Sequence, residues 1–250
     1  MVEYNMFSPE YEKTNTKPDK LYSILPTVLS LLEPIKGKIV LDVGCGSGFF
    51  TREISRMGAK HVYGIDISMQ SIQTARKRTK KEKMTGVQYM LCDVFEDILP
   101  ACDIVCFPFV LNLAKNIQDV LDSLKNCFSS LHHNGKIVLV IDIPMKNKSR
   151  ERIQKQKGFG TVKTLLDEGK DGTLIQIELY NDEKKIYSFQ SRFFTPTTIE
   201  KCLHDTGFKN VQWHTPIISL TGIQKMPNSF WKGYQQICEL GYITAEKLHP

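Results

Sequence analysis

The chain has 250 residues, of which 41% are hydrophobic, and a formal net charge of +6. It can therefore bury a large core, yet no run approaches the roughly 18 apolar residues that a membrane-spanning helix needs. Residues 1–15, MVEYNMFSPEYEKTN, lack the basic and then apolar order of a secretory signal. We therefore expect a soluble, cytoplasmic protein that does not bind a membrane.

From Lys38 onward, short β-branched runs alternate with longer helical patterns. The expected strands are KIVLDV, HVYGID, VQYMLCD, DIVCFP and KIVLVIDI, whose apolar centres indicate a sheet covered on both faces. Between them we expect three helices. One is FFTREISRM, the second begins after a Ser68 N-cap, and the third covers 116–131, where apolar residues form one stripe. This order is typical of a doubly wound α/β fold with a mostly parallel sheet.

The pattern changes after Pro144. A basic stretch over 145–157 runs through the loop-like segments GFGT and GKDG into TLIQIELY and KIYSFQSRFF, which read as an antiparallel hairpin. A helix at TPTTIEKCLHDTGF, a strand at KNVQWHTPIIS, an aromatic helix at SFWKGYQQICEL and a short final segment, GYITAEKL, complete the chain. We divide it into an N-terminal cap segment over 1–36 and a domain over 37–250, with 145–194 inserted as a lid for the substrate.

The seven cysteines form no CxxC pair, and most lie in apolar runs such as CDIVCF. A free thiol in such a run behaves as a small hydrophobic side chain. We therefore expect neither a disulfide framework nor a metal site.

A glycine-rich turn, Gly44–Gly48, follows the first strand of the sheet. Such a turn lets the backbone approach a ligand closely. The spacing departs by one residue from the dinucleotide motif GxGxxG, and Asp42 precedes the first glycine by two positions. A carboxylate there disfavours a pyrophosphate and favours a ligand that carries a cation.

Two further acids end the next two strands, Asp66 in YGIDIS and Asp93 in MLCDV. Asp66 stands at the distance from the glycine turn at which a carboxylate accepts hydrogen bonds from ribose hydroxyls. Asp93 is placed to accept from an exocyclic amine. Each alone is more often an ordinary strand-end or cap residue, but three acids on consecutive strands beside a glycine turn favour a nucleoside site.

The segments VLDVGCGSG, YGIDIS, LCDV and DIVCFPFVLNLA, in this order, resemble the motifs of class I S-adenosylmethionine-dependent methyltransferases over about residues 38–143. The layout of the C-terminal half is similar to small-molecule members of the toxoflavin-synthase-like type. The resemblance implies a Rossmann-like, seven-stranded sheet with an antiparallel hairpin after the fifth strand. It also implies S-adenosyl-L-methionine as the cofactor and in-line transfer of its methyl group to a small molecule.

The resemblance also assigns roles to individual residues. The glycine turn would hold the methionine and ribose portion of the cofactor, and Asp42 would support the turn or the cofactor's amino group. The complete set of implied cofactor-binding residues is Asp42, Gly44, Cys45, Gly46, Gly48, Asp66 for the ribose hydroxyls, Ile67 for the adenine ring, Asp93 and Val94 for its edge, and Phe107 beside the cofactor.

Substrate contacts should come from elements near the carboxyl ends of the strands. These are the N-terminal segment with Tyr4, Phe7 and Tyr11, the loop after Phe107, where Asn112 is either a substrate contact or a helix cap, and the insertion over 145–194.

No catalytic residue is assigned. Among the histidines, His132 and His133 fall on the face away from the ligand, and His214 is the one worth testing as a base, although packing is the favoured interpretation of it.

Basic residues gather in RKRTKKEK, over 76–83, and in the run over 145–157. Such runs are most often solvated helix faces. We hypothesise that Lys146, Lys148, Arg150 and Arg152 belong to a lid that attracts an anionic substrate. The alternatives are a macromolecular substrate (RNA or protein), a non-catalytic scaffold that retains the fold, and an NAD-dependent oxidoreductase. The oligomeric state is not indicated by the sequence.

Overall fold

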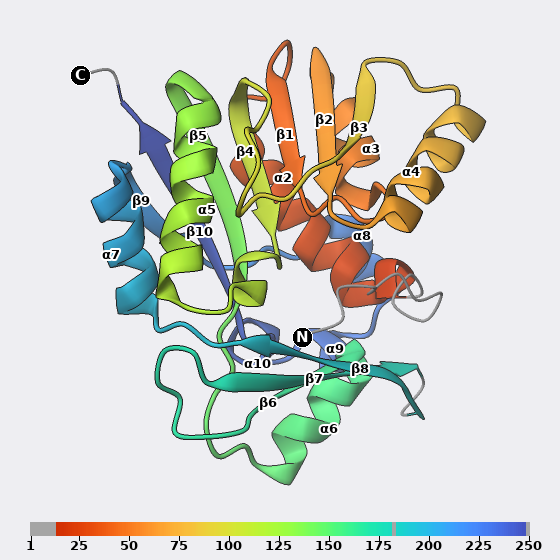
Figure 1. Cartoon of the computed structure of the whole chain (residues 1–250). Helices are drawn as coiled ribbons and strands as arrows, with labels where there is room; N and C mark the ends of the chain where they lie inside the picture. Colours follow the sequence, from red (N-terminus) through yellow and green to blue (C-terminus); the bar gives the residue numbers. More distant parts are fainter. Residues whose placement is uncertain (1–13, 182–183, 249–250) are drawn as a thin grey trace.

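The computed structural model describes residues 14–181 and 184–248. Its main part is a seven-stranded sheet with helices on both faces (Figure 1). The strands are β1 (Ile39–Val43), β2 (His61–Asp66), β3 (Val87–Leu91), β4 (Cys102–Pro108), β5 (Leu131–Asp142), β9 (Lys209–His214) and β10 (Leu240–Lys247). Their order is β3-β2-β1-β4-β5-β10-β9, and only β10 runs antiparallel to its neighbours. The predicted α/β fold with a mostly parallel, seven-stranded sheet is confirmed.

Each face of the sheet has its own apolar layer. Helices α5 (Ile117–Ser130) and α7 (Pro196–Thr206) pack on one face, against alternate strand residues such as Leu41 and Val105. Helices α2 (Leu25–Leu32) and α3 (Phe49–Arg56) pack on the other, against Val40 and Ile104. The strands are apolar throughout because both layers are buried.

The helix after β2 is α4 (Met69–Lys81), and it begins as the sequence predicts. The hydroxyl oxygen of Ser68 accepts a hydrogen bond from the Ser71 amide at 3.2 Å, which is an N-cap. Within α4, Ile72 and Ala75 are buried against Tyr89 of β3. Two basic side chains of α4 form hydrogen bonds within the protein: Arg76 donates to the Tyr89 carbonyl and Arg78 donates to the Ser47 hydroxyl.

A second, smaller part lies below the sheet in Figure 1 and comes from the insertion. It contains α6 (Arg150–Phe159) and an antiparallel sheet of β6 (Thr161–Leu165), β7 (Leu174–Asn181) and β8 (Lys184–Arg192). The predicted hairpin is β7–β8. The loop-like interpretation of GFGT was wrong, because this segment ends α6 and begins β6.

The C-terminal region contains α8 (Leu220–Lys225), α9 (Asn228–Trp231) and α10 (Tyr234–Ile237) before β10. The single aromatic helix expected at SFWKGYQQICEL is two short helices, because Gly233 adopts a left-handed conformation, φ +76°. The break turns Tyr234 onto Phe159 of α6, with ring centroids 4.9 Å apart. The final segment, GYITAEKL, is most of β10 and lies inside the sheet.

Shorter helical turns occupy Thr14–Thr16, Lys20–Ile24 and Leu111–Leu113, and the turn over Lys20–Ile24 is π-helical. Within residues 14–181 and 184–248, no helix combines the length and apolar character needed to cross a membrane.

Candidate active site

A cavity of about 150 Å³ opens at the carboxyl ends of β1, β2, β3 and β4. It lies where the strand order reverses, since β1 stands between β2 and β4. In open α/β sheets ligands bind at such a switch point. Seven of the ten residues assigned to the cofactor line it, namely Gly44, Cys45, Gly46, Asp66, Ile67, Asp93 and Val94.

The glycine turn forms the inner wall of this cavity. Gly44 has φ +67°, and a Cβ atom there would lie 2.1 Å from Val110 Cγ2, so only glycine fits. Gly46 has φ +53°, and a Cβ atom there would meet no atom within 4 Å. Gly48 lies immediately before α3, against Tyr89, and supports the turn from outside the cavity.

Asp66 links the turn to the end of β2. One carboxylate oxygen accepts the Gly46 amide at 2.9 Å and the other accepts the Ser68 amide at 2.8 Å. Burial raises the pKa of this carboxyl group, and the two backbone amides oppose the shift. Beside it, the side chain of Ile67 is 41% exposed on the cavity wall, where a ligand ring would cover it.

The residues after β3 form the opposite wall. Asp93 Oδ1 accepts the Phe95 amide at 2.9 Å, and Oδ2 has no hydrogen-bond partner among the described residues. Val94 is buried beside it. An acceptor oxygen next to an apolar surface suits the edge of a nucleobase.

Asp42 and Phe107 do not line the cavity. Asp42 is fully buried. Its Oδ2 accepts a hydrogen bond from the Thr51 hydroxyl at 2.5 Å, while Oδ1 has no partner in the part of the chain that the structure describes. Burial raises the pKa of Asp42 to about 7. Phe107 is fully buried in the core under α5, and Pro108, Phe109 and Val110 line the cavity in its place.

Sequence reasoning missed a cluster of one lysine and three phenylalanines at the cavity mouth. The Lys20 ammonium lies over the rings of Phe109, Phe50 and Phe49, at 4.5, 4.9 and 5.7 Å from their centroids. The adjacent Phe49 and Phe50 after the glycine turn could have been a signal. A helix that packs on a sheet turns only one of two adjacent side chains toward the core, so the second phenylalanine needs another role.

A second cavity, of about 100 Å³, adjoins the first, and both are lined by Lys20 and Phe109. Its walls come from the N-terminal turn, the carboxyl end of β5, the three-stranded sheet, α6 and α10. No local pattern predicts this cavity, because its residues are spread from Thr14 to Leu240.

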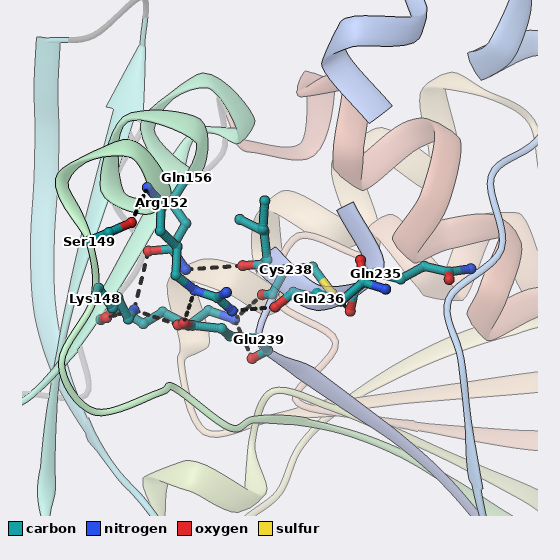
Figure 2. A network of polar contacts seen from close by, with 10 residues as sticks. Lys148, Ser149, Arg152, Gln156, Gln235, Gln236, Cys238 and Glu239 are labelled. Atoms are coloured by element: carbon teal, nitrogen blue, oxygen red, sulfur yellow. Dashed lines mark hydrogen bonds and ion pairs between the residues drawn. The ribbon is translucent and has the colours of Figure 1, made fainter. Parts of the chain in front are cut away.

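The lid residues expected to attract an anion are partly neutralised inside the protein. Figure 2 shows Lys148 and Arg152 converging on Glu239, whose side chain is 1% exposed. Arg152 Nε lies 3.0 Å from Glu239 Oε1, and Lys148 Nζ is ion-paired with Oε2. Two of the four cations in the hypothesis are therefore already paired, while Lys146 and Arg150 are exposed.

The other residues considered for the substrate lie elsewhere. Asn112 is buried, donates to the carbonyls of Asp142 and Arg192, and accepts the Asp142 amide, so it joins β5 to β8. His214, on the edge strand β9, contacts Thr244 of β10, and His132 contacts Asp103. Neither histidine lines a cavity. Tyr4, Phe7 and Tyr11 lie outside the described residues.

A family model described as a methyltransferase domain matches residues 35–184, which is more than half of the chain. The chain belongs to this methyltransferase family. The match covers the glycine turn and both strand-end acids, so it includes the first cavity. The expected class, S-adenosylmethionine-dependent methyltransferase with S-adenosyl-L-methionine as the cofactor, is confirmed.

Curated relatives of this methyltransferase differ in their named substrates. A ubiquinone biosynthesis O-methyltransferase of Neisseria meningitidis serogroup C is 33% identical over 54% of this chain and 62% of its own length. A ribosomal protein L11 methyltransferase of Caldanaerobacter subterraneus is 33% identical over 39% of this chain and 32% of its own length. The chain thus spans less than two thirds of either relative.

Among solved structures, an S-adenosylmethionine-dependent methyltransferase from Mesorhizobium loti superposes with a TM-score of 0.61. The match covers 93% of this chain and 99% of that one at 17% identity. The likeness shows that the two proteins share a fold.

Proposed function

We propose that this protein transfers the methyl group of S-adenosylmethionine to a small-molecule acceptor. The observation that carries the proposal is the second cavity, which adjoins the first at Lys20 and Phe109. A relative named for ubiquinone biosynthesis supports a small molecule.

The residues that line the first cavity support its assignment to the cofactor. Asp66 would accept hydrogen bonds from the ribose hydroxyls, using the lone pairs that do not bind the Gly46 and Ser68 amides. Ile67 would cover one face of the adenine. Asp93 Oδ2, unoccupied by described residues, and Val94 would meet the adenine edge. Asp42 would support the glycine turn through Thr51 of α3. Phe109, rather than Phe107, would lie beside the cofactor.

The cofactor, when bound, supplies a methyl group on a cationic sulfur, which leaves as a neutral thioether. The protein's contribution to such an in-line displacement is mainly to hold the reacting groups in line, which is worth on the order of 7 to 11 kcal/mol. The rings of Phe49, Phe50 and Phe109 already surround an ammonium group. Aromatic faces of this kind stabilise a nearby cation by about 0.5–2 kcal/mol.

A macromolecular acceptor is the second candidate, because a relative is named for a ribosomal protein. The basic run over 76–83 gives it little support, since Arg76 and Arg78 are bonded to Tyr89 and Ser47.

The two candidates are separated by incubating the full chain with methyl-labelled S-adenosylmethionine and a cell extract, and then sorting the label. We expect label in the low-mass fraction. Label confined to the protein or RNA fraction would overturn the small-molecule proposal.

A further inference from the structure

Two residues on the wall of the second cavity carry buried hydroxyl groups. Burial raises the pKa of one of them, that of Tyr234, and Ser23 is close enough to oppose that rise. Ser191 Oγ and Tyr234 Oη both belong to residues on the cavity wall, which are 4% and 1% exposed, and neither makes a hydrogen bond among the described residues. A buried polar group left unpaired is costly, and native proteins retain few of them. Two on one cavity wall indicate that a ligand with polar atoms completes their hydrogen bonds.

The same wall carries a carboxyl group that backbone amides contact. Asp19 is 9% exposed and forms no ion pair among the described residues. The nearby Lys163 is not free to pair with it, because its ammonium contacts Asp142 Oδ1 at 2.7 Å and the carbonyls of Cys238 and Glu239 at 3.2 and 3.0 Å. These three acceptors match the three donors of an ammonium group.

Burial raises the pKa of Asp19 to about 6, against the opposing charges of Lys20 and Lys163. The other titratable groups that face it are Tyr234 of α10, Cys238, and Tyr242 of β10. A carboxyl group with this pKa is ionised at neutral pH and is a stronger base than an ordinary aspartate.

The rest of the wall combines apolar side chains with polar ones, which are Thr14, Lys17, Lys20, Asp142, Gln156, Thr161 and Lys163. Phe109, Phe159, Phe189 and Leu179 surround a volume of about 100 Å³. An apolar cavity of about 150 Å³ holds a benzene molecule. The second cavity is smaller than that, so it suits a small group whose apolar part lies against the phenylalanines.

We propose that the second cavity binds the methyl acceptor, a small molecule with an apolar body and one hydroxyl or amine nucleophile, and that Asp19 accepts the proton of that nucleophile. Tyr234 and Ser191 bind a polar atom of the same molecule. This inference rests on the proposed function and adds to it the acceptor's chemical class and a base.

The proton transfer balances within these groups. The O–H or N–H bond of the acceptor breaks, its proton passes to the Asp19 carboxylate, and the electron pair remains on the oxygen or nitrogen, which bonds to the incoming methyl carbon. Asp19 returns the proton to water when the product leaves. No oxidant or further reactant is needed.

The first test uses Tyr234→Phe, with Tyr63→Phe as the control. Tyr63 belongs to β2 and lines neither cavity. With labelled S-adenosylmethionine and the low-mass fraction of an extract as acceptor, Tyr234→Phe should raise the half-saturating amount of that fraction on the order of tenfold. Tyr63→Phe should leave it unchanged.

The same pair is compared without turnover, by the rise in melting temperature that the low-mass fraction causes in protein loaded with S-adenosylhomocysteine. Tyr234→Phe should reduce that rise and Tyr63→Phe should not. Equal behaviour of the two variants in both assays would overturn the assignment of the cavity.

The second test uses Asp19→Asn. We expect the rate of the wild-type protein to rise with pH through about 6, because Asp19 must be ionised. Asp19→Asn should lower the rate by at least about 100-fold and abolish that limb of the profile, while calorimetric binding of S-adenosylmethionine stays as in the wild type. A retained rate with the same pH limb would overturn the role of Asp19.

The same assays distinguish a failure of this inference from a failure of the proposed function. If the wild-type protein labels low-mass compounds but Asp19→Asn and Tyr234→Phe behave like it, only the inference fails. If the wild-type protein labels none, both fail.

Discussion

At the scale of single residues, the buried carboxyl group of Asp19 makes a prediction about stability. Its pKa is about 6 in the folded protein, against 3.8 for the ordinary group, so the protonated form of Asp19 stabilises the folded state. That stabilisation is complete below about pH 4 and is lost as the pH rises through about 6. Above that pH, Asp19→Asn should be more stable than the wild type by up to about 3 kcal/mol.

Urea unfolding of both proteins at about pH 5 and about pH 8 measures this difference, which should be larger at the higher pH. An equal difference at the two values, or a less stable variant at about pH 8, would show that Asp19 is not held at a raised pKa. A stable variant that has lost its turnover would also fit a functional carboxylate retained at a cost to stability.

At the scale of elements, α6 depends on the ion pairs that join it to the start of β10. The side chains of Lys148, Arg152 and Glu239 are 6%, 17% and 1% exposed. Removing one partner of a buried ion pair leaves an uncompensated charge, so Glu239→Gln should reduce the free energy of unfolding by about 3 to 5 kcal/mol.

The matched control for Glu239→Gln is Asp205→Asn, which breaks an exposed pair with Lys201 on α7. That change should cost less than about 1 kcal/mol. Denaturant unfolding measures both. Similar effects of the two substitutions would contradict the stabilisation of α6 by its ion pairs with Glu239.

The elements also show where sequence reasoning succeeds. The strands β1 to β5 and the helix α5 were predictable, because their apolar patterns are local and continuous. Helix α6 was not, since RERIQKQKGF has no apolar stripe and its stability comes from Glu239, which is far away in the chain. The split between α9 and α10 depends on one left-handed glycine, Gly233, within an otherwise helical composition.

At the scale of the whole molecule, the two cavities differ in how far the sequence predicts them. The first is built from turns that directly follow strands, so Gly44–Gly48, Asp66 and Asp93 could be assigned from spacing. The second unites Asp19, Ser191 and Tyr234, which only the tertiary fold brings together. Local motifs therefore could not predict the second cavity, and Phe107, which was expected beside the cofactor, is buried in the core.

The central claim is that the first cavity binds S-adenosylmethionine through the acids at the strand ends. Calorimetric titration of the full chain with S-adenosylmethionine and with NAD, repeated for Asp66→Ala and for the control Asp122→Ala on α5, which lines neither cavity, tests it directly. We predict that S-adenosylmethionine binds and NAD does not, that Asp66→Ala weakens binding by roughly 10- to 100-fold, and that Asp122→Ala has no effect. Binding of NAD instead, or binding of S-adenosylmethionine indifferent to Asp66→Ala, would contradict the claim.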